Sequence, residues 1–532
     1  MLTYLRRLAT TGTAYTASSI ISKLLAVLLL PLYTRYLTPV DYGAAEVMLV
    51  AVIATSIVIR FGVIEALLRY YYLADERPDR VVSTGFASLF WTATLGAAIA
   101  IPFAEPISEA LLDRPDATLA RIAIFGLWIF TLFEYLATLL RLDERARAYF
   151  VFNMAGVVMA IPLTVWLVVL EDQGANGLLG AIYAATVPMV VWLIVTQRHR
   201  LALLPDWALL RRMVRFGLPT MPAELSLYSL NFIDRIILVR LAGLAEAGLY
   251  ALAIKFAQGI NVLVRGFQLA WPPLAYSIQD DDEARNAYAL IVTWFMAVCT
   301  FAVVGLWLLA RWIVRLLAAP EFFDAYEAIG LLAAGITLYA LYLVQVVVLG
   351  RTGRTEFNFP ATAAATAANI GLNLALVPPL GIVGAGLALI ASYLVVLVLM
   401  YALTQRLFPV PYEWRRLGLI VVAAAALIAG GELLLPTEGG TGLLSRTALW
   451  LSYPIVLWAA RFLSPEERRA LSRLLRPSAV AERLRRLRVA GAPAVAAEDA
   501  SAGSGEHAAA RGPRLTEEVY EAEARDEDRG GA

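Results

Sequence analysis

The chain has 532 residues, of which 60% are hydrophobic and only 16% are charged, and its mean hydropathy is +0.69. This composition excludes the soluble globular classes, while the formal net charge of +1 is uninformative as a total, and no nucleic-acid partner is expected. The single Cys299 excludes an intramolecular disulfide. With His199 and His507 as the two histidines, we expect no metal site and no cofactor.

Long apolar segments follow one another along most of the chain. A hydrocarbon core about 30 Å thick needs about 20 apolar residues in a helix. By this measure the sequence predicts an all-α polytopic membrane protein with about fourteen transmembrane helices, at 13–37, 44–64, 82–104, 119–139, 149–170, 177–197, 216–239, 247–270, 288–310, 325–349, 357–377, 381–404, 416–435 and 443–463. The first is kept as a helix because it lacks the small-residue cleavage site of a signal peptide.

Arginines are divided unequally between the loops on the two sides of these spans. Nineteen lie in loops on the side of the N-terminus, and seven lie opposite, namely Arg35, Arg114, Arg121, Arg240, Arg311, Arg315 and Arg446. Short loops rich in arginine stay in the cytoplasm, and an even number of spans returns the chain to its starting side. We therefore predict a multi-pass protein of the cytoplasmic (inner) membrane with both termini in the cytoplasm.

The sequence contains signs of an internal duplication. The motif Arg35-x5-Asp41-x-Gly43, between the first two spans, recurs as Arg240-x5-Glu246-x-Gly248, at an offset of 205 residues. The turn Gly174-x-x-Gly177 recurs as Gly381-x-x-Gly384, at an offset of 207. Six helices in each copy give both copies the same direction, so we predict two parallel six-helix lobes, an arrangement found in secondary transporters.

The predicted domains follow from this duplication. Residues 1–215 form the N-terminal lobe and linker, 216–405 the C-terminal lobe, 406–463 transmembrane helices 13 and 14, and 464–532 a cytoplasmic tail. The linker, about 198–215, is predicted to contain an interfacial amphipathic helix. The tail is predicted to start as a basic amphipathic helix on the anionic inner leaflet and then to be disordered.

Several motifs together suggest a family. They are Gly12-Thr13-x8-Ser22-Lys23, Pro31-Leu32-Tyr33-Thr34-Arg35-Tyr36-Leu37-Thr38-Pro39-x-Asp41-Tyr42-Gly43, Phe61-Gly62-x4-Leu67-Leu68-Arg69-Tyr70-Tyr71, Phe216-Gly217-Leu218-Pro219, Asn231-x-x-Asp234-Arg235 and Gly248-Leu249-Tyr250. In combination, and over about residues 1–405, the chain resembles the O-antigen and exopolysaccharide flippases of the MOP exporter superfamily. The resemblance implies two six-helix lobes around a central cavity. It also implies transfer of undecaprenyl-pyrophosphate-linked oligosaccharides to the outer leaflet for lipopolysaccharide or other surface polysaccharide biosynthesis, without specifying the sugar.

Six charged residues within the spans are the candidate substrate-binding residues: Lys23, Arg60, Asp234, Arg235, Lys255 and Arg265. A cation near a helix centre costs about 2.5 to 3.5 kcal/mol, so it needs a partner, a water-filled cavity or a route to the surface. The repeat offset maps Arg60 onto Arg265, which places two guanidinium groups opposite each other across the lobe interface. Such a pair suits a pyrophosphate, although both side chains could equally extend to the inner membrane surface.

The remaining charged groups each allow two interpretations. Lys23 and Lys255 either line a deep cavity or form ion pairs with acids of other helices. Asp234, which cannot point the same way as Arg235, is a candidate partner for either lysine or a protonatable group for ion coupling. Glu46 is interpreted as a first-turn residue that stabilises its helix dipole.

Proline positions predict where the helices bend or end. Pro219 and Pro222 open the seventh span, which is the preferred candidate for a bending element, and Pro272 and Pro273 are expected to end the eighth.

We therefore predict a secondary transporter that works by alternating access. It is not expected to be an enzyme, because the longest outer loops, about 105–118 and 311–324, are too short to house catalysis, and the absence of any lysine outside the spans excludes a Walker A motif. An ion-coupled drug or small-molecule exporter and a non-transporting scaffold of a polysaccharide assembly complex remain as alternatives. Expected partners are the lipid-linked oligosaccharide and membrane lipids, with H+ or Na+ as candidate coupling ion and a polymerase or glycosyltransferases as candidate protein partners.

Overall fold

The computed structural model describes residues 29–72, 77–143, 145–354 and 357–463, together with 467 and 469. Within these ranges the chain forms helices joined by short turns and contains no β-strand, as predicted. A helix satisfies its backbone hydrogen bonds within its own segment, as a bilayer demands. The helices are α2 (Leu30–Tyr36), α3 (Pro39–Ile59), α4 (Val63–Tyr70), α5 (Pro78–Ala100), α6 (Ala104–Leu112), α7 (Ala117–Leu142), α8 (Ala146–Thr164), α9 (Gly174–Gln197), α10 (Trp207–Gly217), α11 (Met221–Ala242), α12 (Leu244–Ala257), α13 (Asn261–Ser277), α14 (Asp281–Leu317), α15 (Tyr326–Arg351), α16 (Asn358–Leu407), α17 (Trp414–Leu434), α18 (Gly439–Leu451) and α19 (Tyr453–Ala459).

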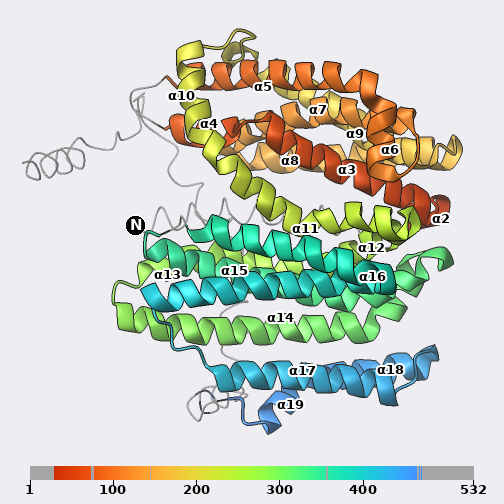
Figure 1. Cartoon of the computed structure of the whole chain (residues 1–532), viewed down its shortest axis with the longest axis vertical. Helices are drawn as coiled ribbons and strands as arrows, with labels where there is room; N and C mark the ends of the chain where they lie inside the picture. The colour runs from red at the N-terminus through yellow and green to blue at the C-terminus, as the bar shows by residue number, and fades with distance from the viewer. Residues whose placement is uncertain are drawn as a thin grey trace, which may run out of the picture. The chain divides into compact units, whose positions relative to one another are not determined.

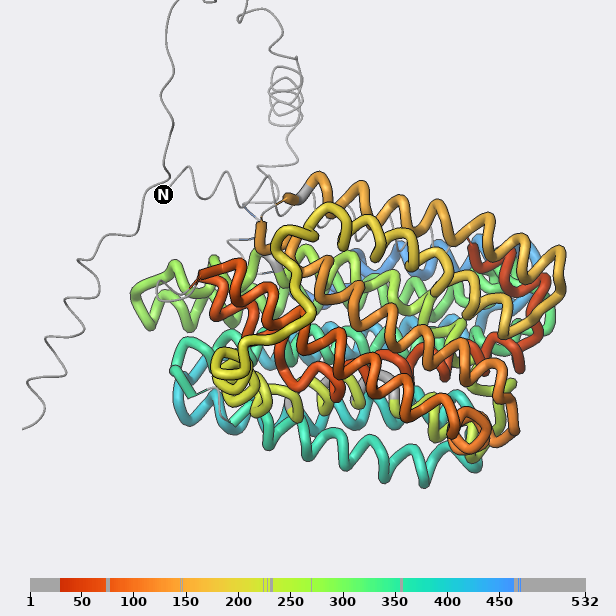
Figure 2. Tube along the Cα trace, turned by 90° about the horizontal axis from the view of Figure 1, so that it is seen from above, coloured from red at the N-terminus to blue at the C-terminus, as the bar shows by residue number. Residues whose placement is uncertain are grey.

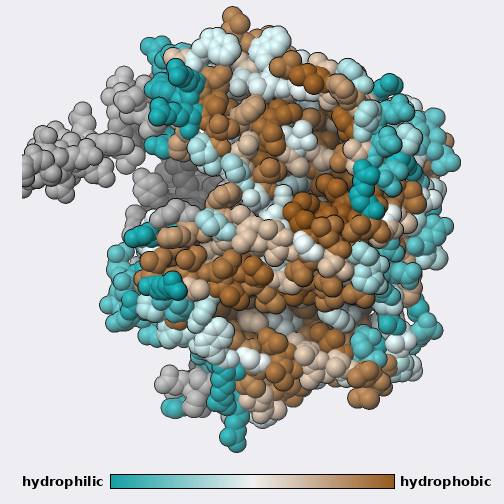
Figure 3. Space-filling view, in the orientation of Figure 1, coloured by the Kyte–Doolittle hydropathy of each residue, from teal (hydrophilic) through white to brown (hydrophobic). Residues whose placement is uncertain are grey.

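Ten helices in the described part of the chain are long and apolar enough to cross a membrane. Figures 1 and 2 show most of the long helices running along one common direction. Figure 3 shows hydrophobic residues across the middle of the visible face and hydrophilic residues gathered at its two ends. This distribution matches a bundle that spans a bilayer, with its polar loops in the water on both sides.

The predicted spans correspond to helices with some differences at their ends. The spans 357–377 and 381–404 are both part of α16, which is kinked at Gly381 (φ 54°). The span 247–270 is divided into α12 and α13 by a 3₁₀ turn at Gln258–Ile260, and Pro272 and Pro273 lie inside α13. The prediction that these prolines end the helix is therefore wrong, because neighbouring helices can support a proline within a membrane helix. The total of fourteen spans remains a prediction.

The helices pack mainly within two sequential groups. The first half, α3 to α9, occupies the upper part of Figure 1, and the second half, α11 to α16, lies below it. α17 and α18 pack on α14 at the edge of the second half. The predicted domain boundaries remain a prediction, and the predicted basic helix of the tail lies almost wholly outside the described residues.

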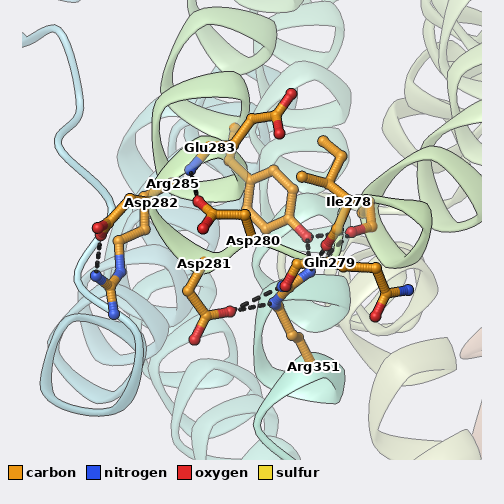
Figure 4. Close-up of polar contacts among 10 residues, drawn as sticks. Ile278, Gln279, Asp280, Asp281, Asp282, Glu283, Arg285 and Arg351 are labelled. Atoms are coloured by element: carbon orange, nitrogen blue, oxygen red, sulfur yellow. Dashed lines mark hydrogen bonds and ion pairs between the residues drawn. The ribbon is translucent and has the colours of Figure 1, made fainter.

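Arginine side chains hold the turns at one end of each half. In the second half, Arg351 at the end of α15 donates hydrogen bonds to Asp281 Oδ1 (2.8 and 3.2 Å) and to the backbone oxygens of Ala275 (3.1 Å) and Ile278 (2.9 Å). It also donates to the Tyr288 hydroxyl at 3.1 Å. Figure 4 shows the Arg351 guanidinium inserted beside the turn between α13 and α14. This single side chain therefore stabilises the junction of α13, α14 and α15.

Arg200 joins helix ends in the first half as Arg351 does in the second. Its guanidinium contacts Asp79 Oδ1 at 2.9 Å, both Asp143 oxygens at 2.9 and 3.1 Å, and the Tyr71 hydroxyl at 3.0 Å. These partners lie near the ends of α4, α5 and α7. Both arginines lie at the end of the bundle that the arginine distribution predicts to be cytoplasmic.

The linker between the halves contains the amphipathic helix α10. Its carboxylate N-cap, Asp206, accepts hydrogen bonds from the amides of Ala208 and Leu209, both at 3.0 Å, and is paired with Arg80 of α5. Leu209 and Met213 are buried, whereas the three arginines of the helix are exposed. An amphipathic helix is thus present where the sequence predicts one, and its place at the membrane surface remains a prediction.

Candidate functional site

The two halves meet at one end of the bundle through Gly43 of α3 and Gly248 of α12. A Cβ added to Gly43 would lie 2.8 Å from the Gly248 nitrogen and would overlap the Leu244 carbonyl oxygen. A Cβ added to Gly248 would lie 3.1 Å from the Gly43 nitrogen and would overlap the Pro39 carbonyl oxygen. Since these neighbours are backbone atoms, both positions need glycine. The two copies of the duplicated motif therefore contact each other directly, at what we call the Gly43–Gly248 end.

The acids of the duplicated motif lie against the other pair of repeated turns. A Cβ on Gly174 (φ 52°), at the start of α9, would lie 3.3 Å from Asp41 Oδ1. A Cβ on Gly381, at the kink of α16, would lie 3.0 Å from Glu246 Oε2, and Glu246 accepts a hydrogen bond from the Ile382 amide. A carboxylate at a helix N-terminus is stabilised by the helix dipole. Both repeated motifs thus have the same structural role in each half.

Other contacts between the halves surround these glycines. Arg240 Nη1 of α11 lies 2.6 Å from Asp113 Oδ1, which follows α6. Thr34 Oγ1 of α2 accepts a hydrogen bond of 3.1 Å from the Ala319 amide, in the turn after α14. The Gly43–Gly248 end is therefore closed by several independent contacts.

At the opposite end, Gly62 of the first half touches Gly217 of the linker. Gly62 has φ 69° and follows Phe61 with φ 47°, so the chain turns sharply between α3 and α4. A Cβ on Gly62 would lie 2.6 Å from the Gly217 Cα, and a Cβ on Gly217 would lie 2.9 Å from the Gly62 Cα. Gly217 ends α10, so this contact joins the first half to the linker.

Glu46 forms an ionic bridge between the halves near the Gly43–Gly248 end. Its Oε1 lies 2.9 Å from Lys255 Nζ of α12, and its Oε2 lies 3.3 Å from Arg235 Nη1 of α11. The Glu46 and Arg235 side chains are 6% and 4% exposed, whereas that of Lys255 is 33% exposed. Removing one member of such a buried group leaves an uncompensated charge and typically costs about 3 to 5 kcal/mol.

The interpretation of Glu46 as a first-turn residue is wrong. Thr38 accepts a hydrogen bond from the Asp41 amide at 3.1 Å and Pro39 occupies the first helical position, so α3 begins five residues earlier than the predicted 44. Glu46 is consequently the eighth residue of α3 and lies in its third turn. Its carboxylate points to the cations of the second half.

Asp234 is not the partner of Lys255, which corrects that prediction. The Asp234 carboxylate accepts hydrogen bonds from the Tyr250 hydroxyl and from the Arg235 amide, the latter at 2.9 Å. Asp234 and Tyr250 are both fully buried. Asp234 therefore connects α11 to α12 within the second half, while its neighbour Arg235 points to Glu46 in the first.

A second ionic bridge, of opposite sign, lies at the other end of α3. Arg60 Nη1 is 3.2 Å from Glu134 Oε2 of α7, and its Nη2 is 3.1 Å from Glu224 Oε1 of α11. At 1.5 Å per residue, the 14 residues between Glu46 and Arg60 separate the two bridges by roughly 21 Å along α3. One helix thus presents an acid to two cations at one end and a cation to two acids at the other.

That Arg60 and Arg265 face each other across the lobe interface stays a prediction, and the two side chains have different surroundings. Arg60 is buried in its pairs with Glu134 and Glu224, whereas Arg265 is exposed on α13, and within the described ranges no ion pair involves Arg265. The 3₁₀ turn at Gln258–Ile260, between α12 and α13, has no counterpart within α3. Lys23 lies outside the described residues.

An apolar cavity of about 520 Å³ lies between α14, α15, α16 and α17. Its lining includes Met296, Leu338, Val398, Trp414 and Val421, with Gln345 as one of its few polar groups. No group of three or more His, Cys, Asp or Glu side chains is placed to hold a metal ion within the described part of the chain.

The sequence interpretation missed the contacts that Glu46, Glu224 and Tyr250 make with the candidate residues. Glu46 was recognisable from the pattern Thr38-Pro39, because an N-cap followed by proline marks a helix start and places Glu46 well inside the span. The pairing of Glu224 with Arg60, and of Tyr250 with Asp234, depends on contacts between helices that no local pattern specifies.

This architecture is that of a polytopic membrane protein. The chain is similar to solved structures of the lipid II flippase MurJ in an inward closed conformation (TM-score 0.68, 12% identity, covering 84% of this chain and 98% of that chain). It is also similar to an inward-facing multidrug resistance MATE family transporter of the MOP superfamily (TM-score 0.60, 16% identity, covering 72% and 95%). At these identities the likeness concerns the fold.

The chain belongs to the family of polysaccharide biosynthesis proteins, whose model matches residues 32–327. A curated relative, the succinoglycan biosynthesis transport protein ExoT of Rhizobium meliloti (strain 1021), is 25% identical over 313 residues, which cover 57% of this chain. The matched segment spans 61% of the length of that relative. The resemblance to the polysaccharide flippases seen in the sequence is thereby confirmed.

Proposed function

We propose that this protein is a secondary transporter that flips polyprenyl-pyrophosphate-linked oligosaccharide from the inner to the outer leaflet of the cytoplasmic membrane. The observation that carries the proposal is the convergence of Arg235 and Lys255 on Glu46 at the interface between the two halves. A diphosphate is recognised by such cations, since lysine supplies a point charge and arginine supplies paired N–H donors. Membership of a polysaccharide biosynthesis family supports an oligosaccharide as the cargo.

The candidate residues are assigned different roles in this proposal. Lys255 is the partly exposed cation of the Glu46 bridge and the first contact of the diphosphate, with Arg235 behind it. Asp234 positions α11 against α12 through Tyr250. Arg265 is exposed and can bind the approaching headgroup. Lys23 remains a candidate from the sequence alone.

The apolar cavity beside α17 supports a lipid-linked substrate. Its lining is hydrophobic, and several lining side chains, including Trp414 and Val421, are more than half exposed. In a bilayer such a cavity faces acyl chains and favours an isoprenoid chain over a sugar. The headgroup would then cross between the halves while its lipid chain stays in an apolar environment.

The transport cycle is proposed to be alternating access with the Gly43–Gly248 end facing outward. Most loop arginines lie at the opposite end, which supports this orientation. Flipping requires the contacts between Gly43 and Gly248 and the bridge at Glu46 to separate while the contact between Gly62 and Gly217 is kept. H+ or Na+ is the candidate coupling ion, and a polymerase or glycosyltransferases are candidate partners.

The test is Lys255→Ala in a host that lacks the chromosomal gene. Surface polysaccharide should fall at least about tenfold, the effect of losing roughly 1.4 kcal/mol of substrate recognition. Arg121→Ala is the matched control, because Arg121 is an exposed arginine without a described ion pair. Normal glycan in Lys255→Ala would contradict the proposed site.

An ion-coupled exporter is the second candidate, because the same fold occurs in MATE transporters. It predicts that deletion of the gene raises drug sensitivity and leaves surface glycan unchanged. The same deletion strain separates the two functions.

A further inference from the structure

We propose that Glu46 is an internal anion that occupies the diphosphate-binding cations when no substrate is bound, and that the substrate opens the Gly43–Gly248 end by displacing it. This inference rests on the proposed function and adds the means by which substrate binding is coupled to the movement of the two halves.

The geometry of the bridge supports this role. One carboxylate uses its two oxygens on two different cations, Oε1 on Lys255 at 2.9 Å and Oε2 on Arg235 at 3.3 Å. This is the arrangement in which a phosphate group would bind the same pair. A diphosphate carries more charge and more acceptor oxygens than a carboxylate, so it can compete for both cations.

The side chains of the two cations differ in exposure, so an incoming anion meets them in a fixed order. Lys255 is 33% exposed, whereas the Arg235 side chain is only 4% exposed. An incoming anion therefore reaches Lys255 first and removes it from Glu46. Asp234 cannot take the place of Glu46, because its carboxylate is held by Tyr250 and by the Arg235 amide.

The competition changes the balance between two conformations because Glu46 and the two cations lie on opposite halves. Glu46 belongs to α3, and both cations belong to α11 and α12, so the bridge exists only while the halves touch. A ligand shifts a conformational equilibrium only if it binds one state more tightly. Here the anion binds the open state more tightly, since Glu46 has moved away with α3. After the anion leaves, Glu46 pairs again with Lys255 and Arg235 and closes this end.

The experiment uses the full-length protein in nanodiscs, with inorganic pyrophosphate as the probe. Spin labels at Tyr36→Cys and Glu321→Cys, in a Cys299→Ala background, report the separation of the halves by EPR. Both label sites are exposed and lie next to the Thr34–Ala319 contact at the Gly43–Gly248 end. Glu105→Gln is the matched control, because it removes an exposed carboxylate of the first half.

In the unsubstituted protein, pyrophosphate should lengthen the distance between the labels. In Glu46→Gln the longer distance should appear without pyrophosphate, and pyrophosphate should bind about fivefold more tightly or better, a coupling typical of two linked sites. Glu105→Gln should behave like the unsubstituted protein.

Two results would overturn the inference, and they are distinguishable. If pyrophosphate binds the unsubstituted protein but Glu46→Gln stays closed and binds no more tightly, Glu46 is not a competitor and the proposed transport function still stands. If pyrophosphate does not bind the unsubstituted protein at all, the proposed headgroup site falls with it. Should Glu46→Gln not insert, Lys255→Gln decides the matter, because a closed distance distribution in that variant contradicts the bridge.

Discussion

Gly248→Ala is the substitution that acts most directly on the closed end of the bundle. The added Cβ would overlap the Pro39 carbonyl oxygen and lie 2.9 Å from the Pro39 carbonyl carbon. Carbon atoms in favourable contact are about 3.5 to 4.0 Å apart, so α3 and α12 must separate by roughly 1 Å. Forcing such a change costs about 1 to 3 kcal/mol, which shifts the ratio of closed to open molecules about 5- to 150-fold.

The assay is an EPR distance measurement between labels at Tyr36→Cys and Glu321→Cys in the Cys299→Ala background. Gly248→Ala should populate longer distances in the absence of any substrate. Gly266→Ala is the matched control, because a Cβ at Gly266 has no heavy atom within 4 Å. An unchanged distance distribution in Gly248→Ala, together with normal surface glycan, would refute the view that this contact closes the outer end.

Three further predictions concern stability, pH and the apolar cavity. Arg351→Ala should lower the free energy of unfolding by about 2 kcal/mol, measured by thermal denaturation in nanodiscs, because it removes the hydrogen bonds that this charged donor gives to Asp281 and to backbone oxygens. The pKa of Asp206 is lowered by the Leu209 amide and by Arg80, so the docking of α10 that depends on the Asp206 carboxylate should be present above about pH 4 and lost below. Hydrogen exchange of the α10 amides, corrected for intrinsic rates, measures this loss. Asp206→Ala should show no such dependence on pH. Val421→Trp should fill part of the cavity and reduce glycan export with unchanged protein levels, whereas export unaffected by this change would contradict a role for the cavity.

Much of the fold follows from the sequence because hydropathy alone specifies membrane helices. The helices that match the predicted spans begin and end within a few residues of them at most positions. The duplication was recognisable because its motifs contain glycines at points of backbone contact. Where two backbones come this close, only glycine fits. At Gly43 and Gly248, the contact between α3 and α12 requires glycine in both copies, and this requirement appears in the sequence as the repeated motif.

The candidate site was only partly predictable, because ion pairing depends on which helices are neighbours. Arg235 and Lys255 were identified as buried charges that need a partner, and the partner is Glu46, on a helix of the other half that is distant in the sequence. That Arg60 and Arg265 face each other stays a prediction, whereas the acids that pair with Arg60 come from α7 and α11.

The proposed flipping is tested most directly in proteoliposomes that contain the purified protein and a fluorescent polyprenyl-diphosphate-linked oligosaccharide. The measurement is the rate at which the headgroup becomes accessible to a membrane-impermeant quencher on the opposite side. We predict a rate well above that of protein-free liposomes, reduced at least about tenfold by Lys255→Ala and unchanged by Arg121→Ala. A rate equal to that of protein-free liposomes, with and without an imposed H+ or Na+ gradient, would contradict the proposed function.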